Sequence, residues 1–179
     1  MSAPLVRPCT HADLPAVLAI VNAEILGHHA NFHTEPRPLT ELEAQWLADH
    51  AAYPWLVVEL KGQVVGFAKA ASYKPRRAYL WTAEVTVYLA EAARGVGLGT
   101  RLYGELLAAL TTRGFHLALA GISLPNDASE ALHRRLGFQL AGVLPEVGHK
   151  HGRWHGVAQY VLHLGGAAAD PRAPRGLGS

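Results

Sequence analysis

The sequence predicts a single α/β domain built on a mixed, twisted sheet of about seven strands with helices on both faces. Two apolar segments, residues 79–89 and 115–123, are too hydrophobic for surface strands and are expected inside the sheet. Residues 98–113, between them, carry leucines at helical spacing, and such a crossover helix joins parallel strands. A hairpin pattern at residues 55–72 adds antiparallel strands, so the sheet is mixed.

Length and composition limit the class of protein. The 179 residues suit one domain, placed at residues 1–165, with a disordered tail expected at residues 166–179, where hydrophobic periodicity ends. No apolar run approaches the roughly 18 residues of a membrane span and no secretory segment opens the chain, so we expect a cytoplasmic protein without membrane association. A net charge of +2 without a basic stripe argues against nucleic-acid binding. The single cysteine, Cys9, excludes an internal disulfide.

The first part of the chain is expected to fold into a short strand and a helix. Residues 6–8 fit the strand. Apolar residues then recur at helical spacing over residues 14–25. Thr10 and Asp13 precede them with the spacing of a capping box, which predicts where this helix starts.

A loop and a second helix are expected next. The loop, residues 27–38, carries three histidines, but no cysteine or helical histidine pair accompanies them, so we expect no metal site. Thr40 and Glu43 form a second capping pattern, which predicts the start of the second helix.

A basic loop, residues 74–77, separates the predicted hairpin from the central strand. It is either a solvated turn or a subsite for an anionic group, because arginine binds carboxylate and phosphate groups through two parallel hydrogen bonds. The residue types alone leave both interpretations open.

Glu84 is the only acidic residue in the central strand, residues 79–89. We expect this side chain to be buried, and burial of a carboxylate is unfavourable unless the group has a function or a partner. Burial also raises the pKa of a carboxyl group, which suits a general base working near neutral pH. Glu84 is therefore the leading catalytic candidate.

The turn after the central strand reads Arg94-x-x-Gly97-x-Gly99 and opens into the predicted long helix. A helix N-terminus presents free backbone N–H groups, which bind phosphate. The glycine spacing does not fit a dinucleotide-binding fingerprint, and the chain has no lysine between Lys74 and Lys150 for a Walker loop. A different phosphate-binding turn, or an ordinary strand-to-helix turn, remains.

The last part of the chain is expected to hold a short helix and two strands. Asn126 caps the helix over residues 128–136, and Gly137 ends it. Residues 139–144 and 157–164 fit strands, with a loop rich in histidine and glycine between them.

Two motifs in the chain resemble those of the GCN5-related N-acetyltransferases (GNAT). They are the glycine turn, and a second pattern formed by Asn126, Ser129, His133, Gly137 and Phe138, in which His133 stands where a tyrosine is usual. Segments 31–36, 53–57, 78–88, 124–127 and 150–155 further resemble the phosphinothricin N-acetyltransferases of that family. The resemblance extends from about Val6 to about Leu164.

The resemblance implies a GNAT fold, in which the central strand and the next parallel strand splay apart around acetyl-CoA. It implies an enzyme that moves the acetyl group to the amine of a small amino-acid-like acceptor by direct attack in a ternary complex. Glu84 would be the base, and His133 stands in the position of the general acid. The cofactor-binding residues implied are Val85, Thr86, Val87, Arg94, Gly95, Val96, Gly97, Leu98, Gly99, Thr100 and Asn126.

The resemblance also implies an acceptor site and an assembly. The acceptor would meet Phe32, Lys74, Arg76 and Tyr79. A homodimer is implied, with the loop 149–155 near the partner. Other acceptors stay open, among them methionine sulfoximine or sulfone, a peptide N-terminus or a polyamine, as does a module that binds CoA without catalysis.

Overall fold

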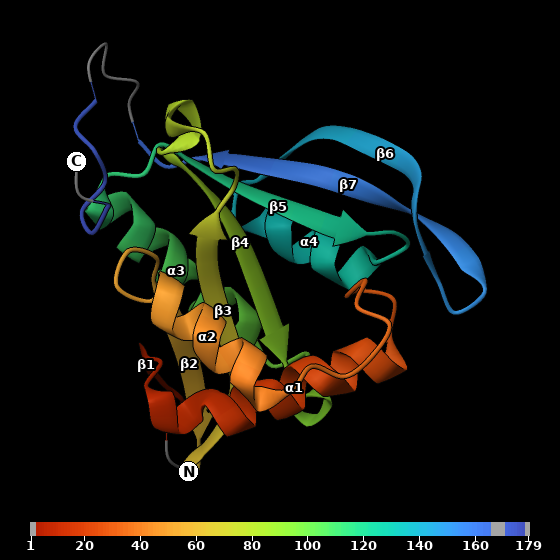
Figure 1. Cartoon of the computed structure of the whole chain (residues 1–179). Coiled ribbons are helices and arrows are strands. Elements are labelled where there is room, and N and C mark those ends of the chain that lie inside the picture. The colour runs from red at the N-terminus through yellow and green to blue at the C-terminus, as the bar shows by residue number, and fades with distance from the viewer. Residues whose placement is uncertain (1–2, 166–170, 178–179) are drawn as a thin grey trace.

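A computed structural model describes residues 3–165 and 171–177 of the chain (Figure 1). One seven-stranded sheet runs through it in the order β1-β2-β3-β4-β5-β7-β6. The strands are β1 (Leu5–Pro8), β2 (Trp55–Leu60), β3 (Gln63–Ser72), β4 (Thr82–Leu89), β5 (Leu117–Ser123), β6 (Gln139–Lys150) and β7 (Arg153–His163). The helices are α1 (Leu14–Gly27), α2 (Leu39–Asp49), α3 (Leu98–Arg113) and α4 (Asp127–Arg135), with short 3-10 turns at η1 (His11–Asp13), η2 (Arg77–Tyr79) and η3 (Glu91–Ala93).

The two faces of the sheet bury separate hydrophobic cores, as the predicted architecture requires. On one face α1 and α2 pack over Trp55, Val57 and Phe67. On the other face α3 packs its leucines over β2, β3 and β4. Leu132 of α4 packs against the same hydrophobic core. Figure 1 shows α1 and α2 in front of the sheet and α3 and α4 behind it. The predicted mixed sheet with helices on both faces is confirmed.

β4 and β5 are the only parallel pair among the described strands, and the two strands diverge partway along their length. Their pairing covers Thr82, Ala83 and Glu84 of β4 and stops there, although β4 continues to Leu89. Beyond Glu84, the backbone edge of β4 that faces β5 has no strand partner, so its polar groups are available to a ligand. The splay implied by the family resemblance is present.

The turn between β4 and α3 requires glycine at one position in particular. Gly97 is the residue before the helix and has a φ of 85°, a left-handed conformation that side chains with a Cβ rarely adopt. The N–H groups of the first turn of α3 have no partners within the helix and face the end of the sheet where β4 and β5 diverge.

Several predicted boundaries differ from the structure. β4 begins at Thr82, and Tyr79 lies in the 3-10 turn η2. Helix α2 begins at Leu39 behind Pro38, so the Thr40 capping pattern does not mark its start. Proline's fixed φ suits the residues at a helix start, and Pro38 takes the cap position with an extended backbone.

The predicted loop at 149–155 is wrong, because these residues form the end of a long hairpin. β6 extends to Lys150 and pairs with β7 across Lys150 and Arg153. A two-residue turn joins the strands, with φ of 51° at His151 and 72° at Gly152. Positive φ at both residues is the geometry that continues strand twist through a tight hairpin.

Part of the segment expected to be a disordered tail packs on the domain. Pro174 is fully buried, and the backbone N–H of Arg175 donates to the Arg113 carbonyl at the end of α3 (2.8 Å). The indole N–H of Trp81 donates to the Arg172 carbonyl (2.8 Å). The expectation is therefore wrong for residues 171–177, and the rest of that segment lies outside the described residues. None of the described helices is long and apolar enough to cross a membrane.

Candidate active site

A cavity of about 490 Å³ opens between the diverging ends of β4 and β5 and reaches the N-terminus of α3. The predicted cofactor residues that line it are Val85, Thr86, Val87, Arg94, Gly95, Gly97, Gly99, Thr100 and Asn126, together with His133. Residues from β4, the glycine turn and the start of α4 thus meet in one place. A helix N-terminus at one end and unpaired strand edges along its length suit a ligand that carries phosphates and amides.

Two predicted cofactor residues do not line this cavity. Val96 points outward and is 70% exposed, while Leu98 is buried in the core beneath α3. The glycines on either side of them do line it. Since neither side chain lines the cavity, these two positions would meet a ligand there only through backbone atoms.

Arg94 is held by an acid that the sequence analysis missed. Its guanidinium donates to the carboxylate of Glu24 on α1 and to the Leu89 carbonyl (3.1 Å). Glu24 is buried and lines the same cavity. The sequence signal for Glu24 was its position between the apolar residues Val21 and Ile25. A charged residue on the buried face of a helix needs a partner.

His133 is buried, and both of its ring nitrogens have partners. Nδ1 lies 2.7 Å from the Ser129 carbonyl, so it carries the proton and donates. Nε2 lies 3.0 Å from the Tyr103 hydroxyl, which then donates to it. Burial lowers the pKa of His133 and favours this neutral ring.

A second cavity, of about 600 Å³, adjoins the first. Both are lined by Ala30, Thr86, Tyr88 and Gly121, so they meet over the middle of β4. Glu84 and Phe32, two predicted site residues, line the second one. The arrangement allows two ligands, one in each cavity, to meet at Thr86, two residues from Glu84 along β4.

Glu84 is exposed rather than buried, contrary to the prediction. Its strand is central, but the side chain projects into the second cavity. Partial desolvation still raises the pKa of Glu84, opposed by the positive charge of Lys69. A carboxylate that is accessible and has a raised pKa retains the properties of a base.

Phe32 is positioned by two neighbours on the β6–β7 hairpin. A Cβ at Gly148 would lie 2.4 Å from the Phe32 ring, so only glycine leaves room for it. The ring of His155 lies 6.3 Å from that of Phe32 and stacks on His29 at 4.5 Å. The loop before α2 is therefore fixed by the end of the hairpin.

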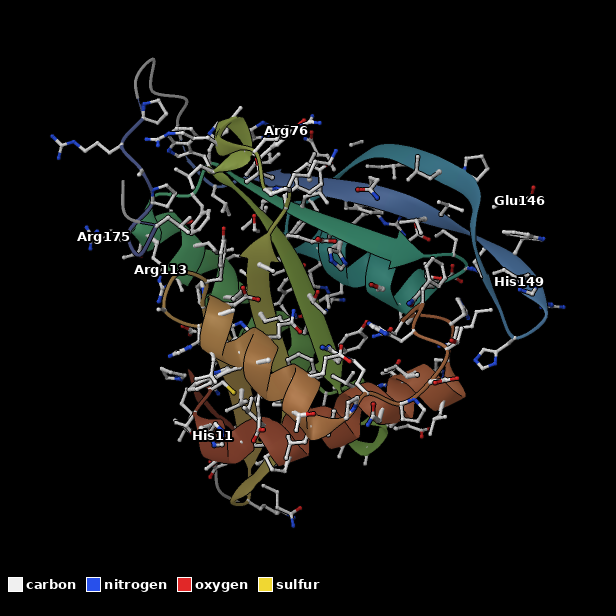
Figure 2. All side chains as sticks on the ribbon, in the orientation of Figure 1. His11, Arg76, Arg113, Glu146, His149 and Arg175 are labelled. Carbon is white, nitrogen blue, oxygen red and sulfur yellow. The ribbon has the colours of Figure 1, made fainter. Side chains whose placement is uncertain are left out.

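The other predicted acceptor residues do not line either cavity. Lys74 and Arg76 are exposed on the connection between β3 and β4, and Tyr79 is half-buried there. The Lys74 ammonium lies 5.4 Å from the centre of the Tyr79 ring. Figure 2 shows Arg76 at the end of the sheet next to η2. Within one chain, the basic loop and Glu84 are not brought together, because β4 carries Glu84 away from that end.

The positive charges inside the second cavity come instead from Lys69 and Arg37, which the sequence analysis missed. The apolar run of β3 was the signal for Lys69, since a lysine in a mostly buried strand is unusual. Over residues 3–165 and 171–177, no group of three or more histidine, cysteine, aspartate or glutamate side chains is placed to hold a metal ion.

The fold and the two joined cavities are those of an acetyltransferase, and comparison with known proteins agrees. Residues 18–138 match the acetyltransferase (GNAT) family, and the chain belongs to that family. It is an acetyl-CoA-dependent N-acetyltransferase.

The relatives define the branch of the family. The chain is 44% identical to phosphinothricin N-acetyltransferase of Streptomyces viridochromogenes over 85% of its own length and 83% of that protein. It is 36% identical to the L-methionine sulfoximine/L-methionine sulfone acetyltransferase of Pseudomonas aeruginosa, covering 93% and 98%. A phosphinothricin acetyltransferase from Sinorhizobium meliloti, solved with acetyl-CoA, superposes with a TM-score of 0.91 at 33% identity, covering 96% of this chain and 94% of that one.

Proposed function

We propose that this enzyme transfers the acetyl group of acetyl-CoA to the primary amine of a small amino-acid-like acceptor of the phosphinothricin type. The observation that carries the proposal is Glu84, which lies where the β4–β5 pairing ends and lines the second cavity, two residues from Thr86, which lines both cavities. The relatives named for phosphinothricin and for methionine sulfoximine support the acceptor class.

Acetyl-CoA would occupy the first cavity. Its pyrophosphate fits the N-terminus of α3, where Gly97 and Gly99 allow close approach to backbone N–H groups. Its pantetheine arm fits the gap beyond Glu84, and backbone N–H groups of residues 85–87 would polarise the thioester carbonyl. This polarisation requires no metal ion in the proposed mechanism.

The acceptor would enter the second cavity as an ammonium ion, which cannot attack a thioester. Glu84 accepts its proton, directly or through a water molecule, and the neutral amine attacks the carbonyl carbon. The new C–N bond forms, the C–S bond breaks, and the nitrogen gives its second proton to the departing thiolate, so the products are the amide and CoA thiol. Transfer is direct, since Cys9 is buried and desolvation raises the pKa of its thiol to about 12.

His133 is better suited to hold the site together than to act as an acid. Its Nδ1 proton is committed to the Ser129 carbonyl, and its Nε2 accepts a hydrogen bond from Tyr103. A departing thiolate with a pKa near about 8.5 needs little help from an acid at neutral pH. We assign His133 a positioning role.

The β6–β7 hairpin would form the contact between two copies of the chain. It exposes Leu140, Val143, Leu144, Val147 and Trp154, each between 48% and 63% accessible. Apolar side chains grouped on one projecting element favour an interface over a solvated surface. We propose a homodimer in the cytoplasm, free of nucleic acid and membrane.

The test is acceptor-dependent release of CoA thiol from acetyl-CoA. L-phosphinothricin, methionine sulfoximine, methionine sulfone, a peptide N-terminus and spermidine are compared at fixed acetyl-CoA. The amino-acid acceptors are expected to give turnover, and acetyl-CoA alone none. Tight CoA binding without thiol release for any amine would instead identify a binding module. The ranking of phosphinothricin against methionine sulfoximine decides between the two named groups of relatives.

A further inference from the structure

Lys69 lies on the same face of the sheet as Glu84. Glu84 pairs across the β3–β4 ladder with Ala71, and Lys69 is two residues from Ala71 along β3. Side chains two residues apart on a strand point to the same face, and diagonal neighbours across a ladder have their Cα atoms about 7–8 Å apart. Both side chains line the second cavity.

The Lys69 ammonium has no hydrogen-bond acceptor among the residues that the structure describes. Its Nζ lies 4.6 Å from the centre of the Trp55 ring, and it makes no hydrogen bond or ion pair with any residue that the structure describes. The other cation of this cavity, Arg37, donates to the Glu41 carboxylate (2.8 Å) and to the Gln45 amide oxygen (3.2 Å). An ammonium that faces a cavity without a protein acceptor is free to donate to an anionic group of a ligand there.

The charged groups around Lys69 come from three elements. Asp49 on α2 and Glu84 on β4 favour its charged form, and Arg37 before α2 opposes it. Burial outweighs the two acids and lowers the pKa of Lys69 to about 8. The ammonium is therefore present at neutral pH but weakly compensated, and an additional anionic group nearby would stabilise it.

We propose that Lys69 binds the α-carboxylate of the acceptor while the α-amine lies at Glu84. This inference rests on the proposed function and adds the requirement that the acceptor be an α-amino acid with a free carboxylate. One carbon separates the amine from the carboxylate in such a molecule, so both groups fit between two diagonal side chains. The same placement disfavours polyamines, whose second ammonium would meet Lys69.

The experiment compares L-phosphinothricin with its α-carboxamide, which keeps the amine and the distal phosphinate. The wild-type enzyme is expected to prefer L-phosphinothricin over the carboxamide by about tenfold or more in kcat/KM. A charge-assisted hydrogen bond to the carboxylate contributes a preference of this size. In Lys69→Met the preference should fall to within about threefold, through a higher KM for the acid, with the acetyl-CoA KM unchanged. Lys69→Arg should retain the preference, because arginine also binds carboxylates.

Lys61→Met is the matched control. Lys61 is an exposed lysine in the turn between β2 and β3, outside both cavities, so its replacement should leave the preference intact. An equal loss toward acid and amide in Lys69→Met would overturn the proposal and leave Lys69 with a structural role on Trp55. A fall in kcat with a shifted acid limb of the pH profile would also overturn it, in favour of tuning of Glu84.

A second measurement does not depend on turnover. Calorimetric titration of L-phosphinothricin into the CoA-saturated protein should show weaker binding in Lys69→Met than in Lys61→Met. If the wild-type protein releases no thiol with any acceptor, the proposed function fails, yet this titration still tests the carboxylate site. Equal affinities in the two variants would overturn the role of Lys69 alone.

Discussion

The hydroxyl of Tyr103 on α3 lies 3.0 Å from Nε2 of His133 on α4, and the two groups are buried together. The opposite nitrogen of the ring donates to Ser129 in the turn before it. This pair fastens α4, which borders the cofactor cavity, to the long helix whose N-terminus forms the end of that cavity. A histidine in a catalytic motif is thereby bound into the packing of two helices.

Tyr103→Phe should therefore affect stability more than chemistry. The change leaves a buried ring nitrogen without its donor, at a cost of about 1–3 kcal/mol in the free energy of unfolding. We expect a lower Tm and a kcat within about threefold of wild type. Thermal unfolding and steady-state kinetics on one preparation check both. A kcat loss of about a hundredfold with an unchanged Tm would restore His133 as an acid.

Glu84→Gln should abolish most of the activity while acetyl-CoA affinity stays nearly constant. The amide keeps the volume of the carboxylate but cannot accept the proton, and loss of a general base costs about 10²–10⁴-fold in kcat. His133→Ala should cost about tenfold at most. If His133→Ala were the more damaging change, the base would have to be sought elsewhere.

Gly97→Val should impair binding of acetyl-CoA. A side chain at a φ of 85° is strained, and it would intrude where backbone N–H groups approach the pyrophosphate. Affinity for CoA should fall by about tenfold or more, about 1.4 kcal/mol. Gly104→Ala is the control, because Gly104 lies within α3 with open space around it. Equal affinities in the two variants would place the pyrophosphate elsewhere.

The pH profile of kcat/KM for the acceptor should have a rising limb set by Glu84 and a falling limb set by Lys69. The base must be deprotonated, so the rate rises with pH through the pKa of Glu84, which desolvation raises above its usual range. Lys69 must be charged, so the rate falls above about pH 8, where its lowered pKa lies. Lys69→Arg should move only the alkaline limb upward, since arginine stays charged. If the alkaline limb of Lys69→Arg stays where it is in the wild type, that limb reports the acceptor amine and not Lys69.

Charged substitutions on the hairpin should separate the dimer. Leu144→Arg combined with Trp154→Glu places charges on the proposed interface, so the mass in solution should halve. Light scattering at micromolar concentration measures it. Leu47→Arg is the control, because Leu47 is about as exposed as Trp154, at 62% against 63%, but lies on α2. A wild-type protein that is monomeric and fully active would refute the assembly.

The strand, glycine turn and helix at the centre of the fold were predictable, because the signals for them are local. Apolar runs, leucine spacing and the glycines of the turn lie within about 35 residues of one another. The hairpin end at residues 149–154 was missed because His149 and Trp154 pair across strands, and pairing register depends on both strands at once.

The sequence by itself determined which residue is available as a base and which turn is available to a phosphate, since both follow from residue identity and local periodicity. Only the tertiary structure decided that Glu24 meets Arg94, 70 residues away, and that Lys69 shares a cavity with Glu84 while Lys74 and Arg76 do not. A strand's period fixes which side chains share a face. Whether a helix or a cavity covers that face depends on how distant segments pack, and no local pattern encodes it.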